Sequence, residues 1–270
     1  MKIDKILYIN LDRCTDRNNN MINLLNEHKL LNNSIRINAV DGKQLNKKDI
    51  LLNDVSINGI NDAYNFEQKV YIPLTVGGIG CALSHKKCYQ YIVDNKIPYC
   101  LILEDDIHVD NDLIDKLEQL NPPNDFEILF LGYHSIHIKK HDIVIKNNDY
   151  EYVKPIKAYG LFGYIVSYTG AKKLLDNVFP ITQQIDSEIP KHFDKINVYA
   201  IKNTFIYSDP SSIYTKFGTD IQIRDKHNIN DKQMNILIIN NDDYLFYLIS
   251  CSSCLLIFFI IIILLCALSK

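Results

Sequence analysis

The sequence predicts an α/β fold whose central sheet is mainly parallel in its first half. Short apolar runs, which are typical of buried strands, alternate with segments whose apolar residues recur at helical spacing. The first of these runs ends in polar residues, and the run at 101–103 leads directly into three carboxylates. Because open α/β sheets bind ligands beyond the carboxyl ends of their strands, we expect a functional site at these polar ends.

The first third of the chain reads as strand, helix and strand. Residues 6–9 form the first apolar run, and the polar turn at 10–13 closes it. A helix is predicted from about 16 to 31, and a second strand at 35–40 is followed by an Asp-Gly turn. Residues 43–75 are polar and rich in asparagine without clear periodicity, so we expect a long loop there.

The middle of the chain repeats this alternation. A glycine-rich segment at 77–80 precedes a predicted helix at 81–93, which leads into the strand at 101–103. A helix near 113–120 stops at two prolines, and residues 128–131 predict another buried strand.

A charged hairpin region at 135–157 separates these elements from a strand at 161–166 and a helix at 169–175. We expect one domain over residues 1–223 and a polar linker over 224–243.

The three carboxylates are Glu104, Asp105 and Asp106. Adjacent ionised carboxylates repel one another, and they must stay hydrated or be paired. Their oxygens suit a hard divalent cation such as Mg²⁺ or Mn²⁺, which could bridge the phosphates of a nucleotide. A strand that simply leaves the sheet into a solvated acidic loop has the same pattern, and the segment alone does not separate the two interpretations.

The turn after the first strand carries a second group of candidates. Asn10, Asp12, Arg13 and Arg17 stand where the first βα turn of such a sheet binds ligands. Arginine binds phosphate through two parallel hydrogen bonds, and residues 13 and 17 could share a helix face. Ordinary surface arginines at the start of a helix would look the same.

Further candidates are less specific. The glycine-rich segment resembles a phosphate-binding loop but lacks a complete fingerprint. Ser84 and His85 could present polar groups to a site, although a single histidine in a helix is more often structural. Asp186 and Glu188 follow a proline in a predicted acidic loop, and either could serve as a general base.

The charge of the chain excludes one class of function. The net charge is −3 and no Lys/Arg run is present, which argues against nucleic-acid binding.

The C-terminal segment suggests a membrane anchor. Residues 244–268 contain no charged side chain and are long enough to span a bilayer. We therefore expect a tail-anchored protein with a transmembrane helix at 244–268 and a domain that faces the cytosol by default, although a lumenal orientation remains open.

The order of these motifs resembles glycosyltransferase family 25, which includes lipooligosaccharide and procollagen galactosyltransferases. A pair of motifs about twenty residues apart, Gly-Cys-Ala-Leu-Ser-His and Leu-Glu-Asp-Asp, is its most specific part. The matching segments are residues 8–13 with Arg17, 38–43, 74–77, 80–85, 101–106, 131–132, 163–167, 170–174, 185–186 and 210–213.

The resemblance implies a GT-A-like nucleotide-sugar transferase fold, a divalent metal that is usually Mn²⁺, and inverting transfer of a hexose from a UDP-sugar to a hydroxyl of a glycan, lipid or protein. Asn10, Asp12, Arg13, Arg17 and Asp41 would then line the nucleotide site. Ser84 and His85 would face the donor, with Asp105 near its ribose. Glu104 and Asp106 would hold the metal, and Asp186 would be the base, with Glu188 second.

One departure from the family pattern bears on activity. The family usually has Glu where this chain has Gly78, which removes a carboxylate beside the donor. A non-catalytic, membrane-anchored module that binds a sugar nucleotide or glycan is therefore the alternative. A metal-dependent phosphohydrolase would need further catalytic motifs, and the sequence contains no such set.

Overall fold

The computed structural model describes residues 1–64, 74–139, 145–147, 150–208 and 235–239. Thirteen strands lie within these residues. They are β1 (Lys5–Asn10), β2 (Ser34–Asn38), β3 (Tyr99–Glu104), β4 (Ile107–Val109), β5 (Ile128–Gly132), β6 (Ser135–Lys139), β7 (Ile145–Asn147), β8 (Tyr150–Val153), β9 (Lys157–Tyr159), β10 (Gly163–Ser167), β11 (Val198–Ile201), β12 (Ile206–Ser208) and β13 (Asn235–Ile239).

Six α-helices connect or follow these strands in the described part of the chain. They are α1 (Thr15–Glu27), α2 (Ile57–Tyr64), α3 (Val76–Asp94), α4 (Leu113–Gln119), α5 (Tyr168–Val178) and α6 (Ile185–Glu188). Short 3₁₀ turns at Leu31–Asn33, Gly42–Gln44, Lys47–Asp49 and Ile189–His192 complete the elements.

The main sheet has eight strands in the order β2-β1-β3-β10-β5-β11-β8-β7. Strand β1 pairs in parallel with both β2 and β3, so the parallel arrangement expected for the first half is confirmed. Strand β10 runs antiparallel to both β3 and β5, so the sheet as a whole is mixed. A strand buried on both faces has the same apolar composition in either direction, so the sequence contained no signal for this reversal.

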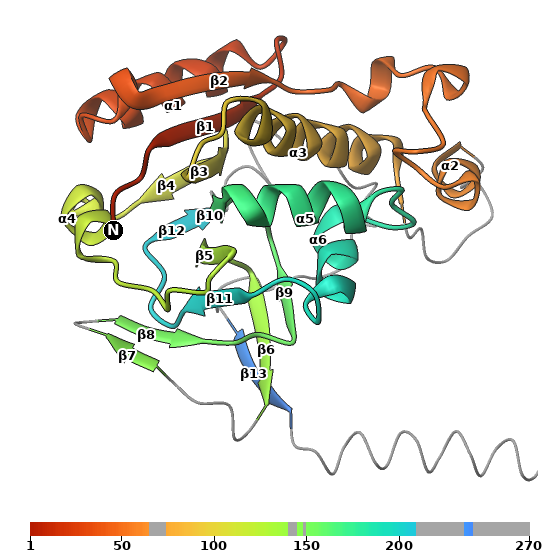
Figure 1. Cartoon of the computed structure of the whole chain (residues 1–270). Coiled ribbons are helices and arrows are strands. Elements are labelled where there is room, and N and C mark those ends of the chain that lie inside the picture. Colours follow the sequence, from red (N-terminus) through yellow and green to blue (C-terminus); the bar gives the residue numbers. More distant parts are fainter. Residues whose placement is uncertain (65–73, 140–144, 148–149, 209–234, 240–270) are drawn as a thin grey trace, which may run out of the picture.

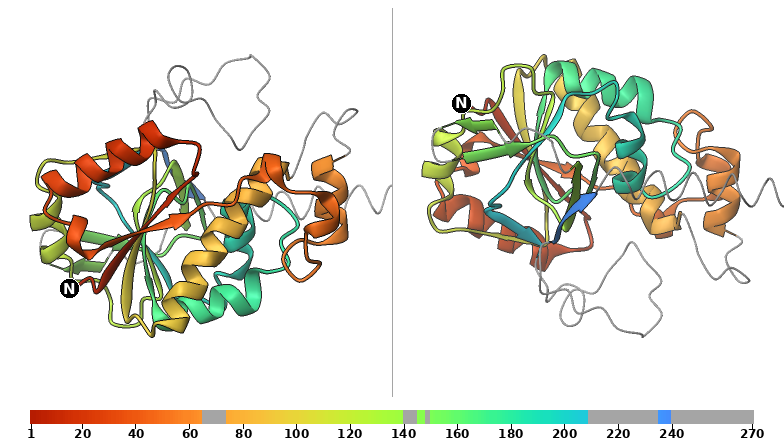
Figure 2. Two further views of the ribbon diagram at one scale, coloured as in Figure 1. Left: turned by 90° about the horizontal axis from the view of Figure 1, so that it is seen from above. Right: turned by 90° about the horizontal axis from the view of Figure 1, so that it is seen from below.

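Helices cover both faces of the sheet (Figures 1 and 2). A hydrophobic core lies on each face of the sheet, because successive side chains along β3 point to opposite faces. Cys100 and Ile102 pack with α3 and α5, whereas Leu101 and Leu103 pack with α1 and α4. All four side chains are fully buried. Both cores thus fix β3, whose end carries the acidic triplet, at the centre of the domain.

Helix α3 begins five residues earlier than the sequence predicted. Thr75 caps it, with its hydroxyl oxygen accepting a hydrogen bond from the Gly78 backbone N–H at 3.0 Å. The glycines thus lie inside the first turns of a helix rather than in a loop that surrounds phosphate. A Cβ atom on Gly80 would lie only 3.0 Å from Gly42 Cα, so this glycine allows α3 to pack directly on the chain that follows β2.

Two other segments differ from expectation. The long loop predicted at 43–75 contains helix α2 and two 3₁₀ turns. Residues 235–239, assigned to the polar linker, form β13, which pairs in parallel with β6. The local sequence Asn-Ile-Leu-Ile-Ile is rich in β-branched residues and favours a strand despite its polar flanks.

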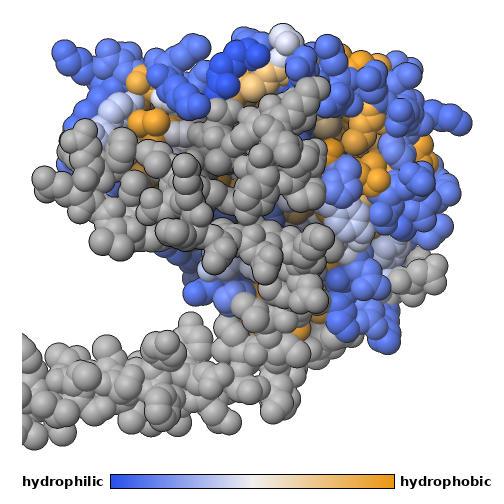
Figure 3. Space-filling model, turned by 180° about the vertical axis from the view of Figure 1, so that it is seen from behind, coloured by the Kyte–Doolittle hydropathy of each residue, from blue (hydrophilic) through white to orange (hydrophobic). Residues whose placement is uncertain are grey.

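The predicted membrane span at 244–268 lies outside the described residues. Within the described residues, no helix combines the length and apolar character needed to cross a bilayer. Viewed from behind, the surface they form is mostly hydrophilic, with smaller apolar areas between (Figure 3).

Candidate active site at the ends of strands β1 and β3

The centre of the candidate site is Asp105, which two neighbours hold in place. Asn10, the last residue of β1, donates a hydrogen bond from Nδ2 to Asp105 Oδ2 at 2.6 Å. Arg17 of α1 donates from Nη1 to Asp105 Oδ1 at 2.9 Å. Burial raises the pKa of Asp105, while the charge of Arg17 and both hydrogen bonds lower it. The side chains predicted separately from the two strand ends thus form one cluster.

Asp106 has less charge compensation than Asp105. Its Oδ2 lies 3.5 Å from Arg17 Nη1, and burial together with the negative charge of Glu104 raises the pKa of Asp106 to about 7. Two carboxylates that repel one another in a partly buried position offer the oxygen ligands that a divalent cation requires. Glu104 and Asp106 thus offer carboxylate oxygens of the kind that Mn²⁺ or Mg²⁺ would take.

His85 adjoins Glu104 from the side of α3. Its Nε2 lies 3.2 Å from Glu104 Oε1, and its Nδ1 lies 2.7 Å from the hydroxyl of Tyr164. The Tyr164 hydroxyl is in turn 2.9 Å from that of Tyr89, and all three rings are buried. His85 is thus fixed by partners on both of its ring nitrogens, and the tyrosines were not among the residues that the sequence suggested.

The other candidates of the nucleotide site form ion pairs at the neighbouring strand ends. Arg13 Nε donates to Asp41 Oδ2 at 2.7 Å, which joins the turn after β1 to the segment after β2. Asp12 pairs with Arg36 at 2.8 Å and accepts a hydrogen bond from Asn38 at 2.6 Å.

Arg36 was missed by sequence reasoning. It also donates from Nε to Asn10 Oδ1 at 2.9 Å, so it supports the amide that holds Asp105. Its position between two isoleucines, Ile35 and Ile37, in β2 was the available signal.

The hydroxyl of Ser84 is hydrogen-bonded to two backbone segments. It is buried, donates to the carbonyl oxygen of Gly80 at 2.6 Å and accepts from the backbone N–H of Val40 at 2.8 Å. Ser84 therefore joins α3 to the chain after β2. These two bonds use the hydroxyl proton and one of its lone pairs, and a contact of Ser84 with the donor stays a prediction.

Asp186 lies in the same electrostatic environment as the acidic triplet. Burial raises its pKa, hydrogen bonds from Ser187 and the backbone of Gly160 lower it, and the negative charge of Glu104 raises it again. A carboxylate whose pKa is raised is a stronger base than an ordinary aspartate. Asp186 is thus a largely buried carboxylate whose pKa is raised, in part by Glu104.

Glu188 has a different role. Its Oε2 accepts hydrogen bonds from the backbone N–H groups of Thr182 and Gln183 at 3.0 and 3.2 Å and from the Thr182 hydroxyl at 2.8 Å. Its Oε1 pairs with Lys191 at 3.0 Å. This buried carboxylate holds the turn before α6, and its part as a second candidate base stays a prediction.

The side chain of Gln184 occupies the space beside Gly78. A Cβ atom on Gly78 would lie 2.7 Å from both Gln184 Cδ and Gln184 Nε2. Gln184 Nε2 also donates to the Thr75 hydroxyl oxygen at 3.4 Å. The position where the family usually has Glu is therefore covered by an amide from the segment that carries Asp186.

The chain thus has an α/β sheet with an acidic strand end beside a polar first turn. These features are typical of α/β proteins that bind ligands at the carboxyl ends of their strands. A family model described as glycosyltransferase family 25 (LPS biosynthesis protein) matches residues 3–189. The chain belongs to this family, which confirms the resemblance of its motifs.

Curated relatives agree with this assignment. Human procollagen galactosyltransferase 2 is 30% identical over 213 residues, which cover 76% of this chain and 33% of the relative. A glycosyltransferase 25 family member of Drosophila melanogaster is 28% identical over 205 residues, or 72% of this chain and 31% of the relative. The bovine protein named probable inactive glycosyltransferase 25 family member 3 is 27% identical over 203 residues, 72% of this chain and 32% of the relative. The chain thus spans about a third of the length of each.

Proposed function

We propose that the chain transfers a hexose, galactose or glucose, from a UDP-sugar to a hydroxyl group of a glycan, lipid or protein, with inversion at the anomeric carbon. The observation that carries this proposal is the joined cluster of Asn10, Arg17 and the acidic triplet at the ends of two adjacent parallel strands. Family membership supports the reaction class.

Glu104 and Asp106 would hold the divalent cation, Mn²⁺ or Mg²⁺. When bound, the cation supplies positive charge that stabilises the departing diphosphate. Asn10 and Arg17 each donate a hydrogen bond to one oxygen of Asp105. Each oxygen has a second lone pair, which would accept a hydrogen bond from a donor group such as a ribose hydroxyl. Because its partners already set its orientation, Asp105 needs little reorganisation when the donor binds.

Asp186 would act as the base. The acceptor oxygen forms a bond to the anomeric carbon while the bond from that carbon to the diphosphate oxygen breaks. The hydroxyl proton goes to the Asp186 carboxylate, and UDP leaves. The raised pKa of Asp186 increases its strength as a proton acceptor.

The alternative function is a module that binds a sugar nucleotide or glycan without turnover. The glycine at position 78 and the name of the bovine relative favour it. A panel of UDP-hexoses, each incubated with and without Mn²⁺, separates the two functions. Release of UDP that requires Mn²⁺ supports the transferase, whereas Mn²⁺-dependent UDP binding without any release of UDP supports the module.

We also propose that residues 244–268 anchor the domain to a membrane with the active site toward the cytosol. The uncharged length of this segment supports the proposal. Protease treatment of sealed membrane vesicles tests the orientation, because a cytosolic domain is degraded while a lumenal one is protected.

A further inference from the structure

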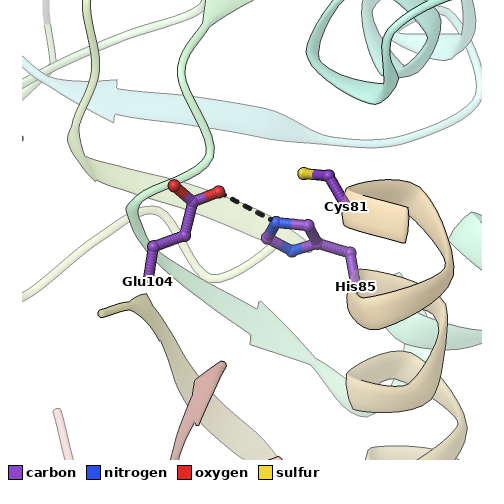
Figure 4. A group of neighbouring side chains, drawn as sticks. All are labelled: Cys81, His85 and Glu104. Atoms are coloured by element: carbon purple, nitrogen blue, oxygen red, sulfur yellow. Dashed lines mark hydrogen bonds and ion pairs between the residues drawn. The ribbon is translucent and has the colours of Figure 1, made fainter. Parts of the chain in front are cut away.

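Three side chains with different ligand chemistry converge beside the proposed metal position. The ligand atoms of Cys81, His85 and Glu104 all lie within 4.8 Å of one another. Figure 4 shows the sulfur and the imidazole directed from α3 toward the carboxylate at the end of β3. Because Cys81 and His85 are four residues apart in one helix, they occupy the same face.

The orientation of His85 suits a metal ligand. A metal-binding histidine usually donates its second N–H to an oxygen atom, which fixes the ring and its tautomer. The oxygen of the buried Tyr164 hydroxyl lies 2.7 Å from His85 Nδ1 and can accept that hydrogen. With a cation bound, this tautomer would direct the lone pair of His85 Nε2, which lies 3.2 Å from Glu104 Oε1, to the cation.

The spacing of the three ligand atoms is close to that of a tetrahedral site. Zinc bonds to sulfur, nitrogen and oxygen of about 2.3, 2.0 and 2.1 Å place neighbouring ligand atoms about 3.3–3.6 Å apart. The His85 and Glu104 atoms already lie at 3.2 Å, and no pair in the cluster exceeds 4.8 Å. Small side-chain rotations would complete the geometry and leave a fourth position open for water.

The chemistry of this set differs from that of the acidic triplet. Oxygen ligands suit Mg²⁺ and Mn²⁺, whereas thiolate and imidazole together favour Zn²⁺ and similar soft cations. We propose that Cys81, His85 and Glu104 bind a thiophilic divalent cation of the Zn²⁺ type. The Cys81 thiol loses its proton to solvent when its sulfur binds the cation.

Glu104 would belong to both ligand sets. Two divalent cations that share the Glu104 carboxylate would lie close together and repel one another. Zn²⁺ is therefore expected to weaken Mn²⁺ binding, a consequence that rests on the proposed function, whereas Zn²⁺ binding itself does not.

Cobalt absorption tests the site directly. The full chain, purified in detergent with a thiol-free reductant and freed of metal, is titrated with Co²⁺, and the sulfur-to-cobalt charge-transfer band in the near ultraviolet is recorded. Cys81→Ser should lose most of the band, and Zn²⁺ should displace the cobalt from the wild type. Cys88→Ser is the matched control, because this buried cysteine of the same helix lies outside the cluster and should leave the band unchanged.

A second variant gives an independent check. Glu104→Gln should keep the band, but its Kd for Co²⁺ should rise by at least ~10-fold. Loss of an outer-shell partner of a metal ligand already weakens metal binding by this factor. Circular dichroism confirms that each variant is folded. A band of equal intensity in wild type and Cys81→Ser, or no band in the wild type, would overturn the proposal. Absorption does not depend on turnover, so a chain that binds Co²⁺ here yet releases no UDP would contradict only the proposed function.

Discussion

Arg17 and Asp105 form an ion pair of 2.9 Å between helix α1 and the end of strand β3, and their side chains are only 9% and 10% exposed. The pair joins two elements that are far apart in the sequence. Asn10 completes it from β1, so the first turn of the sheet and the acidic triplet are fixed relative to one another.

Loss of Arg17 should destabilise the fold. Arg17→Met leaves the Asp105 charge buried beside two other carboxylates, and breaking such a pair typically costs about 3–5 kcal/mol. The free energy of unfolding, measured by urea titration, should fall by this amount. Lys146→Met is the matched control, because Lys146 pairs with Glu151 at the surface with 72% of its side chain exposed, and its loss should change stability far less. Equal changes in the two variants would contradict the importance of the buried pair.

Asp186 should be essential for turnover and dispensable for UDP binding. Asp186→Asn keeps the size of the side chain but removes the proton acceptor, so kcat should fall by about 10²–10⁴-fold while the Kd for UDP stays near its wild-type value. Glu188→Gln should instead lower the melting temperature, because Glu188 holds the turn before α6. Unchanged kcat in Asp186→Asn would exclude it as the base.

The strand ends illustrate what could be predicted from the sequence. Asn10 and Glu104 were identified because each follows an apolar run, and the parallel pairing of β1 with β3 then brings them to the same edge. Asp186 was one of two carboxylates in a predicted acidic loop, and only the family resemblance ranked it above Glu188. Local pattern suffices where a functional residue directly follows a buried strand.

Residues that act through distant partners were not predictable in this way. The hydrogen bonds of the Ser84 hydroxyl with the backbone of Gly80 and Val40 were not indicated by its sequence neighbours. Tyr164 reaches His85 only because β10 runs antiparallel to β3, and the apolar sequence of that strand does not encode its direction. Such contacts depend on tertiary packing, which a single strand or helix pattern does not specify.

The metal-free protein should become less stable as the pH rises through neutrality. The pKa of Asp106 is about 7 in the folded chain against 3.8 in the unfolded chain, so the folded state binds more protons between these values. Because stability falls with pH wherever the unfolded state binds fewer protons, the contribution of Asp106 decreases from pH 4 to pH 7.

Urea unfolding at pH 5, 6, 7 and 8 in the presence of EDTA measures this effect. Asp106→Asn should flatten the profile, and saturating Mn²⁺ should restore stability at pH 8 because the cation compensates the carboxylates. A wild-type profile as flat as that of Asp106→Asn would show that Asp106 titrates normally.

Gly78 and Gln184 should be energetically coupled. Gly78→Ala introduces a Cβ atom that forces the Gln184 amide to move, although alanine favours a helix more than glycine does. In a Gln184→Ala background the same substitution meets no obstacle, so it should be more favourable by about 1 kcal/mol. A double-mutant cycle of urea unfolding gives the coupling energy, and a value near zero would show that the Gln184 side chain does not occupy this space in solution.

The central claim is that the acidic triplet supports sugar transfer, and UDP release from UDP-galactose and UDP-glucose measures it most directly. With Mn²⁺ present, the wild-type chain should release UDP, and EDTA, Asp106→Asn and Asp186→Asn should each abolish this release. Absence of Mn²⁺-dependent release with every UDP-hexose, in a folded wild-type chain that is offered acceptor hydroxyls, would contradict the account.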